Sequence, residues 1–495
     1  MARPNILHVF CDQQRFDTIH ALGNPVIRTP SFDRIAHEGV AFTSAYSPCP
    51  VCIAARCSMI YGQYPQHTGC YENRRMPTDD RQSFMGALTA AGYRTHGIGK
   101  CHFSPDRNAL RGFQTRERQE EGAPRENPDA HDEYLKFLWE RGHRHVCDVH
   151  GIRGEMYYVP QPSQLPAEVH PTHWVGDRSV AFIEEQRDAE EPWYLFASFI
   201  HPHPPFTPPN PWHKLYRAPL MPLPKITHDD ESLWTHINRK QNRYKYRDQG
   251  IDLNLMRNIR AYYYACISFI DSQLGRILAA LERTGQLDDT LILCTADHGE
   301  HLGDYRCFGK RSMHDTAARV PMLLRMPGRF EGGRRCDRVA SLVDVAPTVL
   351  SVAGASVASH ELDGVDLHAL LEGSSDRRYV YAQHEEGHAA SYMIASERWK
   401  YVWSSGDRRA FLFDREQDPG ETRSRAGAHF LREDRDAMKR QLVSYLKETG
   451  ETRGLEGDDW KSFPLLRPSE DPDAGLLIQD PPWADTRIPG YTDGR

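Results

Sequence analysis

The sequence predicts an α/β protein: a large domain with a mostly parallel sheet covered by helices on both faces, and a smaller C-terminal α+β domain with an antiparallel sheet. Three observations carry this prediction. Four apolar segments end abruptly in polar residues, as buried strands do, and helical patterns lie between them. After about Gly373 the composition changes to shorter alternating segments. The chain has 495 residues, which is too many for one simple hydrophobic core.

The four predicted strands span residues 5–11, 93–99, 193–200 and 290–295. Between them, we expect a helix that is capped by Thr172 and runs to about Gln186. A longer helix is expected over residues 257–283, because apolar side chains recur there at helical spacing: Ile259, Tyr263, Ile270, Leu274, Ile277 and Leu281. Strands that alternate with helices are typical of a parallel sheet with both faces covered.

Charged or metal-binding side chains follow each predicted strand directly. They are Asp12, Lys100, His201 with His203, and Asp297 with His298. A single Asp after a strand is usually a turn residue or a helix cap. Four such cases in one sheet indicate a site, because open α/β sheets bind ligands beyond the carboxyl ends of their strands.

The domain organisation follows from these patterns. Residues 1–373 are predicted to form the catalytic domain, 374–453 the small domain and 454–495 an extended C-terminal arm. The small domain should contain strands within 391–403 and 410–413 and a helix near 433–447. The arm either grips a second subunit, in a dimer or tetramer, or frays as a tail. Two polar, Pro-rich stretches, 114–170 and 208–253, are expected as insertions near the crevice.

Composition excludes several functional classes. The chain has 61 Lys and Arg against 68 Asp and Glu, a net charge of -7, so we expect neither a nucleic-acid partner nor a membrane partner. Any bound anion must therefore be held by a few local cations. The N-terminus does not resemble a secretory signal, and no apolar run is long enough to span a bilayer. Eleven scattered cysteines are typical of free thiols in a reducing cytoplasm, where we expect the protein to be located.

The most specific motif is Cys52-Ile53-Ala54-Ala55-Arg56, which continues to Gly62, Pro65 and Gly69. It resembles the motif of the sulfatase family, in the alkaline phosphatase superfamily. The resemblance implies that a formylglycine-generating enzyme oxidises Cys52 to formylglycine, an aldehyde that acts as its hydrate. Two positions depart from the family pattern: Ala54 replaces the usual Pro, and Tyr61-Gly62-Gln63 replaces Thr-Gly-Arg.

There is a chemical reason for an aldehyde at this position. A serine that accepted a sulfuryl group would form a stable ester, whereas a geminal diol can expel sulfate by breaking its own C–O bond. We expect the motif to open a helix over residues 54–60, whose N-terminal N–H groups favour an anion at that end.

The resemblance implies one divalent metal ion, held by Asp12, Gln13, Asp297, His298 and the nucleophile derived from Cys52. Asp12-Gln13 matches the N-terminal metal motif of the family, and Asp297-His298 matches the second. The oxygen ligands suit Ca²⁺, whereas the imidazole of His298 favours Mn²⁺ or Zn²⁺. The ion would polarise the ester oxygens and stabilise the alkoxide.

The remaining motifs supply cations. Gly99-Lys100-Cys101-His102 and His203-Pro204-Pro205 resemble two further family segments, and Lys310 occupies the place of the second active-site lysine. The resemblance implies that Arg56 and Lys100 position the diol and that His102 helps it to collapse. It also implies that Lys310 and His203 bind the sulfate and that Asn73 adds a hydrogen bond. His203 is preferred to His201 because only His203 has a Pro two residues later.

Within the superfamily, the motif details are similar to those of the cytoplasmic choline-sulfatases and the phosphonate monoester hydrolases. We expect a small anionic ester as substrate and hydrolysis of sulfate monoesters as the reaction. The main alternative is a phosphonate or phosphate ester hydrolase, but the phosphonate enzymes tend to carry Tyr and Thr where this chain has Lys100 and His102. A second alternative is a binding homologue that is never modified, for which Ala54 is the best argument.

Overall fold

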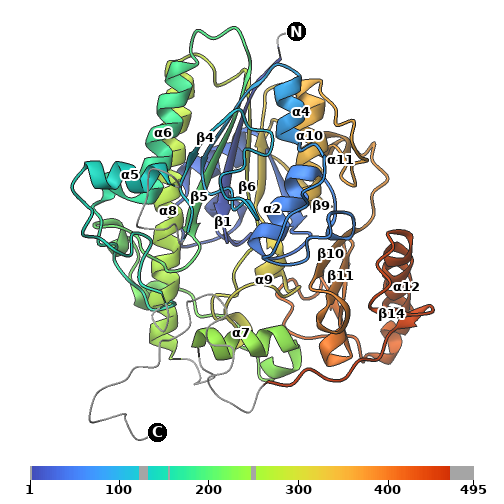
Figure 1. Ribbon diagram of the computed structural model, residues 1–495. Helices are drawn as coiled ribbons and strands as arrows, with labels where there is room; N and C mark the ends of the chain where they lie inside the picture. Colours follow the sequence, from blue (N-terminus) through green and yellow to red (C-terminus); the bar gives the residue numbers. More distant parts are fainter. Residues whose placement is uncertain (1–2, 122–131, 154–156, 247–251, 469–495) are drawn as a thin grey trace, which may run out of the picture.

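A nine-stranded sheet forms the centre of the large domain (Figure 1). The computed structural model describes residues 3–121, 132–153, 157–246 and 252–468. The strand order is β4-β3-β5-β1-β6-β8-β2-β7, and β9 also pairs with β2. Their bounds are β1 Asn5–Asp12, β2 Val40–Tyr46, β3 Arg94–Gly99, β4 Thr115–Arg118, β5 Trp193–Pro202, β6 Thr290–Ala296, β7 Arg319–Val320, β8 Met322–Arg325 and β9 Arg334–Ser341.

The five strands from β4 to β6 are parallel, which confirms the predicted fold class. β8 is antiparallel to β6 and to β2, whereas β2 and β9 run parallel. In the register, Cys11 lies opposite both Phe199 of β5 and Ala296 of β6. The residues that follow these strands therefore reach the same edge of the sheet.

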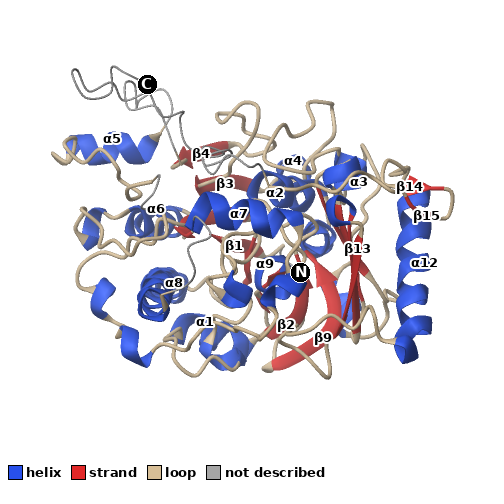
Figure 2. Cartoon of the chain, turned by 90° about the horizontal axis from the view of Figure 1, so that it is seen from below, coloured by secondary structure: helices blue, strands red, loops and turns tan. Residues whose placement is uncertain are grey.

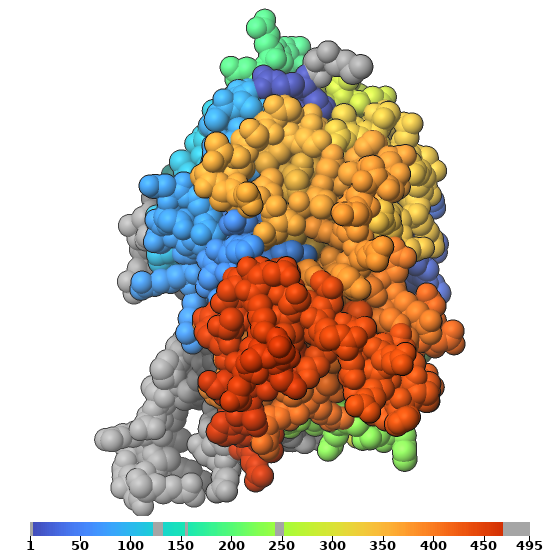
Figure 3. Space-filling view, turned by 90° about the vertical axis from the view of Figure 1, so that its right-hand side faces the viewer, coloured from blue at the N-terminus to red at the C-terminus, as the bar shows by residue number. Residues whose placement is uncertain are grey.

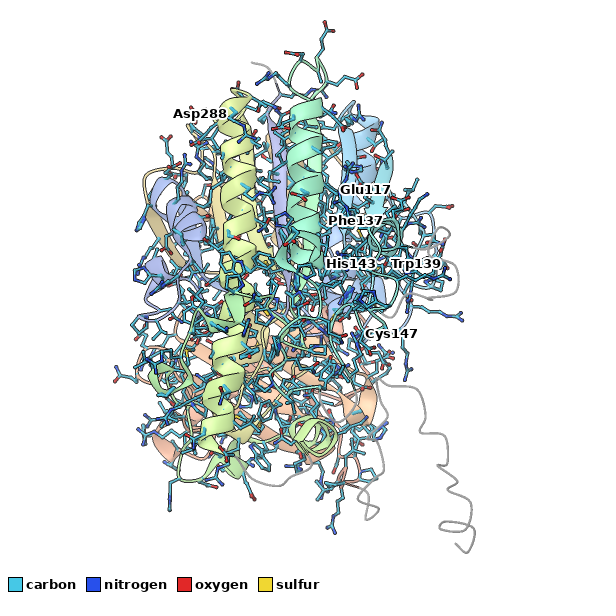
Figure 4. The ribbon with its side chains drawn as sticks, turned by 90° about the vertical axis from the view of Figure 1, so that its left-hand side faces the viewer. Glu117, Phe137, Trp139, His143, Cys147 and Asp288 are labelled. Atoms are coloured by element: carbon cyan, nitrogen blue, oxygen red, sulfur yellow. The ribbon has the colours of Figure 1, made fainter. Side chains whose placement is uncertain are left out.

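Helices cover both faces of the sheet (Figure 1). On one side lie α6 (Pro171–Glu185) and α8 (Leu253–Arg283), which Figure 4 shows side by side. On the other side lie α2 (Cys52–Tyr61), α4 (Phe84–Ala90) and α10 (Val345–Ala353). The central strands β1, β5 and β6 between them are almost entirely buried, and their apolar side chains form one continuous core with those of the helices.

The two predicted helix starts need correction. α6 begins at Pro171, and its cap is His170, whose side chain accepts a hydrogen bond from Thr172 N; Thr172 itself lies inside the helix. A Pro at the first position is favourable because its missing N–H would have no helical partner. α8 begins at Leu253 and not at residue 257, because the Asp252 side chain caps the N–H groups of Asn254 and Leu255.

The C-terminal region contains a separate antiparallel sheet in the order β10-β11-β12-β13. The strands are β10 Val380–His384, β11 Ser391–Ala395, β12 Trp399–Ser404 and β13 Arg409–Asp414. Helix α12 (Arg432–Glu448), which matches the helix predicted near 433–447, buries Met438, Leu442 and Leu446 and packs on β11 and β12 of this sheet (Figure 2). Figure 3 shows the last described part of the chain, in red, gathered at one end of the molecule.

The predicted C-terminal arm is only partly described. Its first part forms a short hairpin of β14 (Leu455–Glu456) and β15 (Asp459–Trp460), in which Trp460 stacks on Tyr392 and Trp403. Residues 469–495 lie outside the described residues. The domain boundaries at 373 and 453 stay predictions.

The two predicted insertions contribute to different parts of the fold. The first supplies the edge strand β4 and helix α5 (Glu133–Glu140), and the second supplies helix α7 (His236–Tyr246). The view from below shows α7 in front of the strand ends, together with α9 (Asp315–Ala318) (Figure 2). None of the helices in the described ranges has the length and apolar run that a bilayer crossing requires.

Short helical segments complete the described chain. They are η1 His20–Leu22, α1 Pro30–Glu38, α3 Pro65–Thr68, η4 Ala167–Val169, η5 Trp212–Lys214, η6 Ala218–Leu220, η7 Asp230–Leu233, η8 Asp304–Arg306, η9 Leu342–Asp344, α11 Leu367–Leu371, η10 Gly387–Ala389, η11 Ser405–Asp407 and η12 His429–Leu431.

Candidate active site

Cys52 is the first residue of α2, where the helix presents its free N–H groups. Its buried Sγ lies 2.8 Å from Lys310 Nζ, 3.3 Å from His298 Nε2 and 3.7 Å from Asp12 Oδ1. Burial alone would raise the pKa of the Cys52 thiol, but the charges of Lys310, Lys100 and His298 hold that pKa well below its ordinary value. The site therefore stabilises negative charge at this position.

The neighbouring cysteines have different surroundings. Burial raises the pKa of the Cys49 thiol well above its ordinary value, and Cys49 Sγ donates to Tyr71 O at 3.3 Å. Burial and the nearby Cys70 likewise raise the pKa of Cys57. Of these three thiols in the motif region, Cys52 is the one whose thiolate is stabilised.

Four side chains around Cys52 fit a divalent metal ion. Asp12, Cys52, Asp297 and His298 each offer one ligand atom, and these atoms lie within 4.8 Å of one another. Asp12 ends β1, and Asp297 follows β6 directly, so adjacent parallel strands bring the two carboxylates together. Two carboxylates and an imidazole suit Mn²⁺ or Zn²⁺, whereas Ca²⁺ would depend on the oxygen ligands.

Gln13 lies beside this group, but its described contacts are with the protein. Its Oε1 accepts a hydrogen bond from Lys310 Nζ at 2.9 Å, and its backbone N donates to Asp297 Oδ1 at 2.9 Å. Its Nε2 donates to Glu300, whose carboxylate also accepts from Tyr158 Oη. The Glu300 contact orients the amide so that the Gln13 oxygen faces the site.

Lys100 and His203 meet at a carboxylate that the sequence did not predict. Lys100 Nζ lies 2.7 Å from Asp12 Oδ2 and 2.9 Å from Glu121 Oε2, and His203 Nδ1 lies 2.9 Å from Glu121 Oε1. Arg153 also pairs with Glu121 at 2.7 Å. Burial would raise the pKa of Glu121, but these cations, His203 first, hold it well below its ordinary value.

The sequence model of the Sulfatase family matches residues 4–355, which is most of the chain. The chain belongs to the sulfatase family. A second model, described as N-sulphoglucosamine sulphohydrolase, C-terminal, matches residues 303–448.

Individual relatives of this sulfatase agree with that assignment. An arylsulfatase of Clostridium perfringens is 31% identical over 91% of this chain and 96% of its own length. A choline-sulfatase of Rhizobium meliloti is 29% identical over 84% and 81%. Among solved structures, the phosphonate monoester hydrolase of Agrobacterium radiobacter superposes with a TM-score of 0.77 at 25% identity, and covers 94% of this chain and 100% of its own.

In this sulfatase, Arg56 hydrogen-bonds to the two carboxylates of the candidate metal site. Its Nε lies 3.0 Å from Asp297 Oδ2 and its Nη2 lies 3.1 Å from Asp12 Oδ2, while Nη1 donates to Lys100 O at 2.6 Å. Arg56 is almost fully buried. These contacts fix the two carboxylates relative to each other and to Lys100.

His102, Asn73 and the alternative histidine His201 have different surroundings. His102 has a positive φ of 55° and its backbone N donates to Glu120 Oε1 at 3.0 Å; its side chain adds a hydrogen bond that lowers the pKa of Cys52. Asn73 Oδ1 accepts a hydrogen bond from Ile53 N at 2.9 Å, so Asn73 satisfies a free N–H at the start of α2.

His201 contacts Thr207 and Thr172. Burial, and next the charge of the nearby His170, lower the pKa of His201 well below its ordinary value.

Proposed function

We propose that this protein hydrolyses sulfate monoesters with a formylglycine nucleophile made from Cys52 and one divalent metal ion. The observation that carries the proposal is the position of Cys52 Sγ: it lies at the start of α2, 2.8 Å from Lys310 Nζ, and within the group of metal-binding side chains. Both the helix N-terminus and the lysine favour an anion there. The arylsulfatase and choline-sulfatase relatives support the same reaction class.

Asp12, Asp297 and His298, with the Gln13 oxygen nearby, would hold the metal ion, which polarises ester oxygens and favours an ionised nucleophile when it is bound. Formylglycine supplies a hydrated aldehyde, one hydroxyl of which attacks while the other drives the release of sulfate. A formylglycine-generating enzyme is the partner that this chemistry requires.

The residues of the chain bind the anion and move protons. Lys310 lies beside the nucleophile and is placed to bind the non-bridging oxygens of the ester. Lys100 and His203 form a second cationic pair on the other side of Asp12. His102, whose side chain hydrogen-bonds to Cys52, is placed to accept the proton whose removal releases sulfate. Fixed charges of this kind stabilise a transition state without reorganising.

The resemblance to a phosphonate monoester hydrolase structure favours one alternative, a phosphonate or phosphate ester substrate. Sulfate is preferred here because of Lys100 and His102. A two-metal phosphate monoesterase is less well supported, because the described residues contain one group of metal-binding side chains. The proposed cytoplasmic location is supported by the eleven free cysteines of the described chain. A homo-oligomer stays a prediction.

The substrate proposal is tested by comparing sulfate and phosphonate esters with the same aryl leaving group. Replacing Lys100 by Tyr and His102 by Thr together should reduce sulfatase kcat/KM by about 10²–10⁴-fold, the usual contribution of acid–base assistance. Phosphonate turnover should fall far less and serves as the internal control for folding. A wild type that prefers the phosphonate ester, or an unchanged ratio in the double variant, contradicts the proposal and favours the alternative.

A further inference from the structure

Helix α7 presents three buried side-chain amides along one face. Asn238, Gln241 and Asn242 occupy positions i, i+3 and i+4, which share a face of a helix, and their side chains are 0%, 2% and 4% exposed. Buried amides require hydrogen-bond partners. All three find them in the segment 301–310, which connects the metal-binding Asp297-His298 pair to Lys310.

Gln241 binds both backbone groups of Lys310. Its Oε1 accepts a hydrogen bond from Lys310 N at 3.2 Å, and its Nε2 donates to Lys310 O. Outside regular helix or strand, backbone N–H and C=O groups need such partners. One side chain therefore fixes both peptide groups of the residue that carries the ammonium group next to Cys52.

Asn242 and Asn238 hold neighbouring parts of the same segment. Asn242 Nδ2 donates to Arg306 O at 2.9 Å, and its Oδ1 accepts from Phe308 N at 3.1 Å. Asn238 Nδ2 lies 3.1 Å from His301 Nε2. The segment is thus tied to α7 at its beginning, its middle and its end.

The helix is itself anchored on the C-terminal sheet. Asp407, just after β12, accepts a hydrogen bond from His236 N at 2.7 Å, and Arg239 forms an ion pair with the same carboxylate. Asp407 is held in turn by Ser404 Oγ at 2.6 Å. A helix with both its first turn and its amide face fixed can set the position of Lys310.

We propose that Gln241 is a positioning residue for the reaction: it places the Lys310 backbone so that Lys310 Nζ reaches the nucleophile at residue 52. This inference rests on the proposed function, in which Lys310 binds the transferred group. Lys310 Nζ lies 2.8 Å from Cys52 Sγ and 2.9 Å from Gln13 Oε1, and a displacement of about 1 Å at such a group can cost about 10²-fold in rate.

A double-mutant cycle tests the proposal. Gln241→Met keeps the length of the side chain and removes both hydrogen bonds, and it should lower kcat/KM by about 10–100-fold. In a Lys310→Ala background, the same substitution should cost less than about 2-fold, because residues that act through one group are non-additive. The cycle uses whichever aryl ester, sulfate or phosphonate, the wild type hydrolyses faster, so that an error in the substrate assignment does not affect the outcome.

Amide hydrogen exchange at Lys310 provides a readout that is independent of turnover. Exchange should be at least about 10-fold faster in Gln241→Met. It should be unchanged in Lys240→Met, which places the same new side chain at the neighbouring exposed position. If Gln241→Met does not fold, Gln241→Glu takes its place in both tests. Glu keeps the acceptor for Lys310 N and loses the donor to Lys310 O, so the loss of kcat/KM and the rise in exchange at Lys310 should be smaller than those expected for Gln241→Met. Equal losses of kcat/KM in both backgrounds, or unchanged exchange at Lys310, would overturn the proposal.

Discussion

Around Cys52, the charges of a few buried side chains decide which thiol can become a nucleophile. Lys310, Lys100 and His298 stabilise negative charge at Cys52, whereas Cys49 and Cys57 lie in apolar surroundings that favour the neutral thiol. Arg56 offsets the mutual repulsion of the two metal carboxylates, with Nε and Nη2 each about 3 Å from a carboxylate oxygen. The candidate site thus contains cations both next to Cys52 and next to the two carboxylates.

Much of this site could be predicted from the sequence, for a specific reason. Parallel pairing brings the residues that follow each strand to one edge, so Asp12, Lys100 and Asp297 were predicted together. Glu121 and Gln241 were missed. Glu121 follows the edge strand β4, whose sequence, Thr-Arg-Glu-Arg, has no apolar pattern, and Gln241 acts through the backbone of a distant loop.

Glu121 gives the first prediction. Its carboxylate binds Lys100 and His203, the cations proposed to bind the substrate anion, so Glu121→Gln should tighten inhibition by inorganic sulfate. A hydrogen bond to a charged group contributes about 1.5–3 kcal/mol, so the inhibition constant should fall by about 10-fold. The matched control is Glu117→Gln in β4, whose carboxylate pairs with Arg178 of α6 (Figure 4). A weaker inhibition by sulfate in Glu121→Gln would contradict the expectation.

Among the elements, the four strands predicted for the large sheet, β1, β3, β5 and β6, match to within about two residues, because continuous apolar runs mark them clearly. The other strands of that sheet, β2, β4, β7, β8 and β9, and strand β10 of the C-terminal sheet were not predicted. β4 is polar, and β10 is short and lies just before the segment that carried the antiparallel pattern. The two helix starts were misplaced because their caps, His170 and Asp252, lie outside the apolar periodicity.

The close contact of β3 with β5 gives the second prediction. Gly99 has a φ of +89°, and a Cβ at this position would lie 2.0 Å from Ser198 O. Gly99→Ala should therefore reduce the free energy of unfolding by about 3 kcal/mol, from backbone strain and overpacking together. Gly142→Ala, at φ +84° with open space around its Cβ, should cost only about 1 kcal/mol. Urea denaturation measures the free energy of unfolding of both variants. Equal losses in Gly99→Ala and Gly142→Ala would show that the contact with Ser198 O does not contribute to stability.

In the whole molecule, a buried ionic cluster joins the C-terminal sheet to the large domain. Lys400 Nζ of β12 lies 2.6 Å from Asp315 Oδ1 and 2.8 Å from Met313 O, and it also pairs with Glu421. Burial and the neighbouring Asp315 raise the pKa of Glu421 to about 7, so this carboxyl depends on Lys400 for its charge. Two domains could be predicted from chain length and composition, but their contact could not, because it joins residues far apart in sequence.

This cluster gives the third prediction. Lys400→Met removes the ammonium group that pairs with Glu421 and Asp315, while Asp315 keeps its ion pair with Arg319. It should lower the free energy of unfolding by about 3–5 kcal/mol at pH 8. The loss should be smaller at pH 5. Without Lys400, the folded-state pKa of Glu421 lies further above its unfolded value, so the folded state binds a proton more readily than the unfolded state and gains stability as the pH falls. Denaturant unfolding of wild type and variant at both pH values measures the difference, and a loss that does not change with pH would rule out this origin.

We propose that turnover passes through a formylglycine made from Cys52. The most direct measurement compares kcat for an aryl sulfate with the fraction of formylglycine at position 52, determined by mass spectrometry in preparations made with increasing amounts of a formylglycine-generating enzyme. We predict that kcat rises in proportion to this fraction and extrapolates to zero where no formylglycine is present. Turnover should be abolished in Cys52→Ala. Full turnover in protein whose Cys52 remains an unmodified thiol, or in Cys52→Ala itself, would contradict the account.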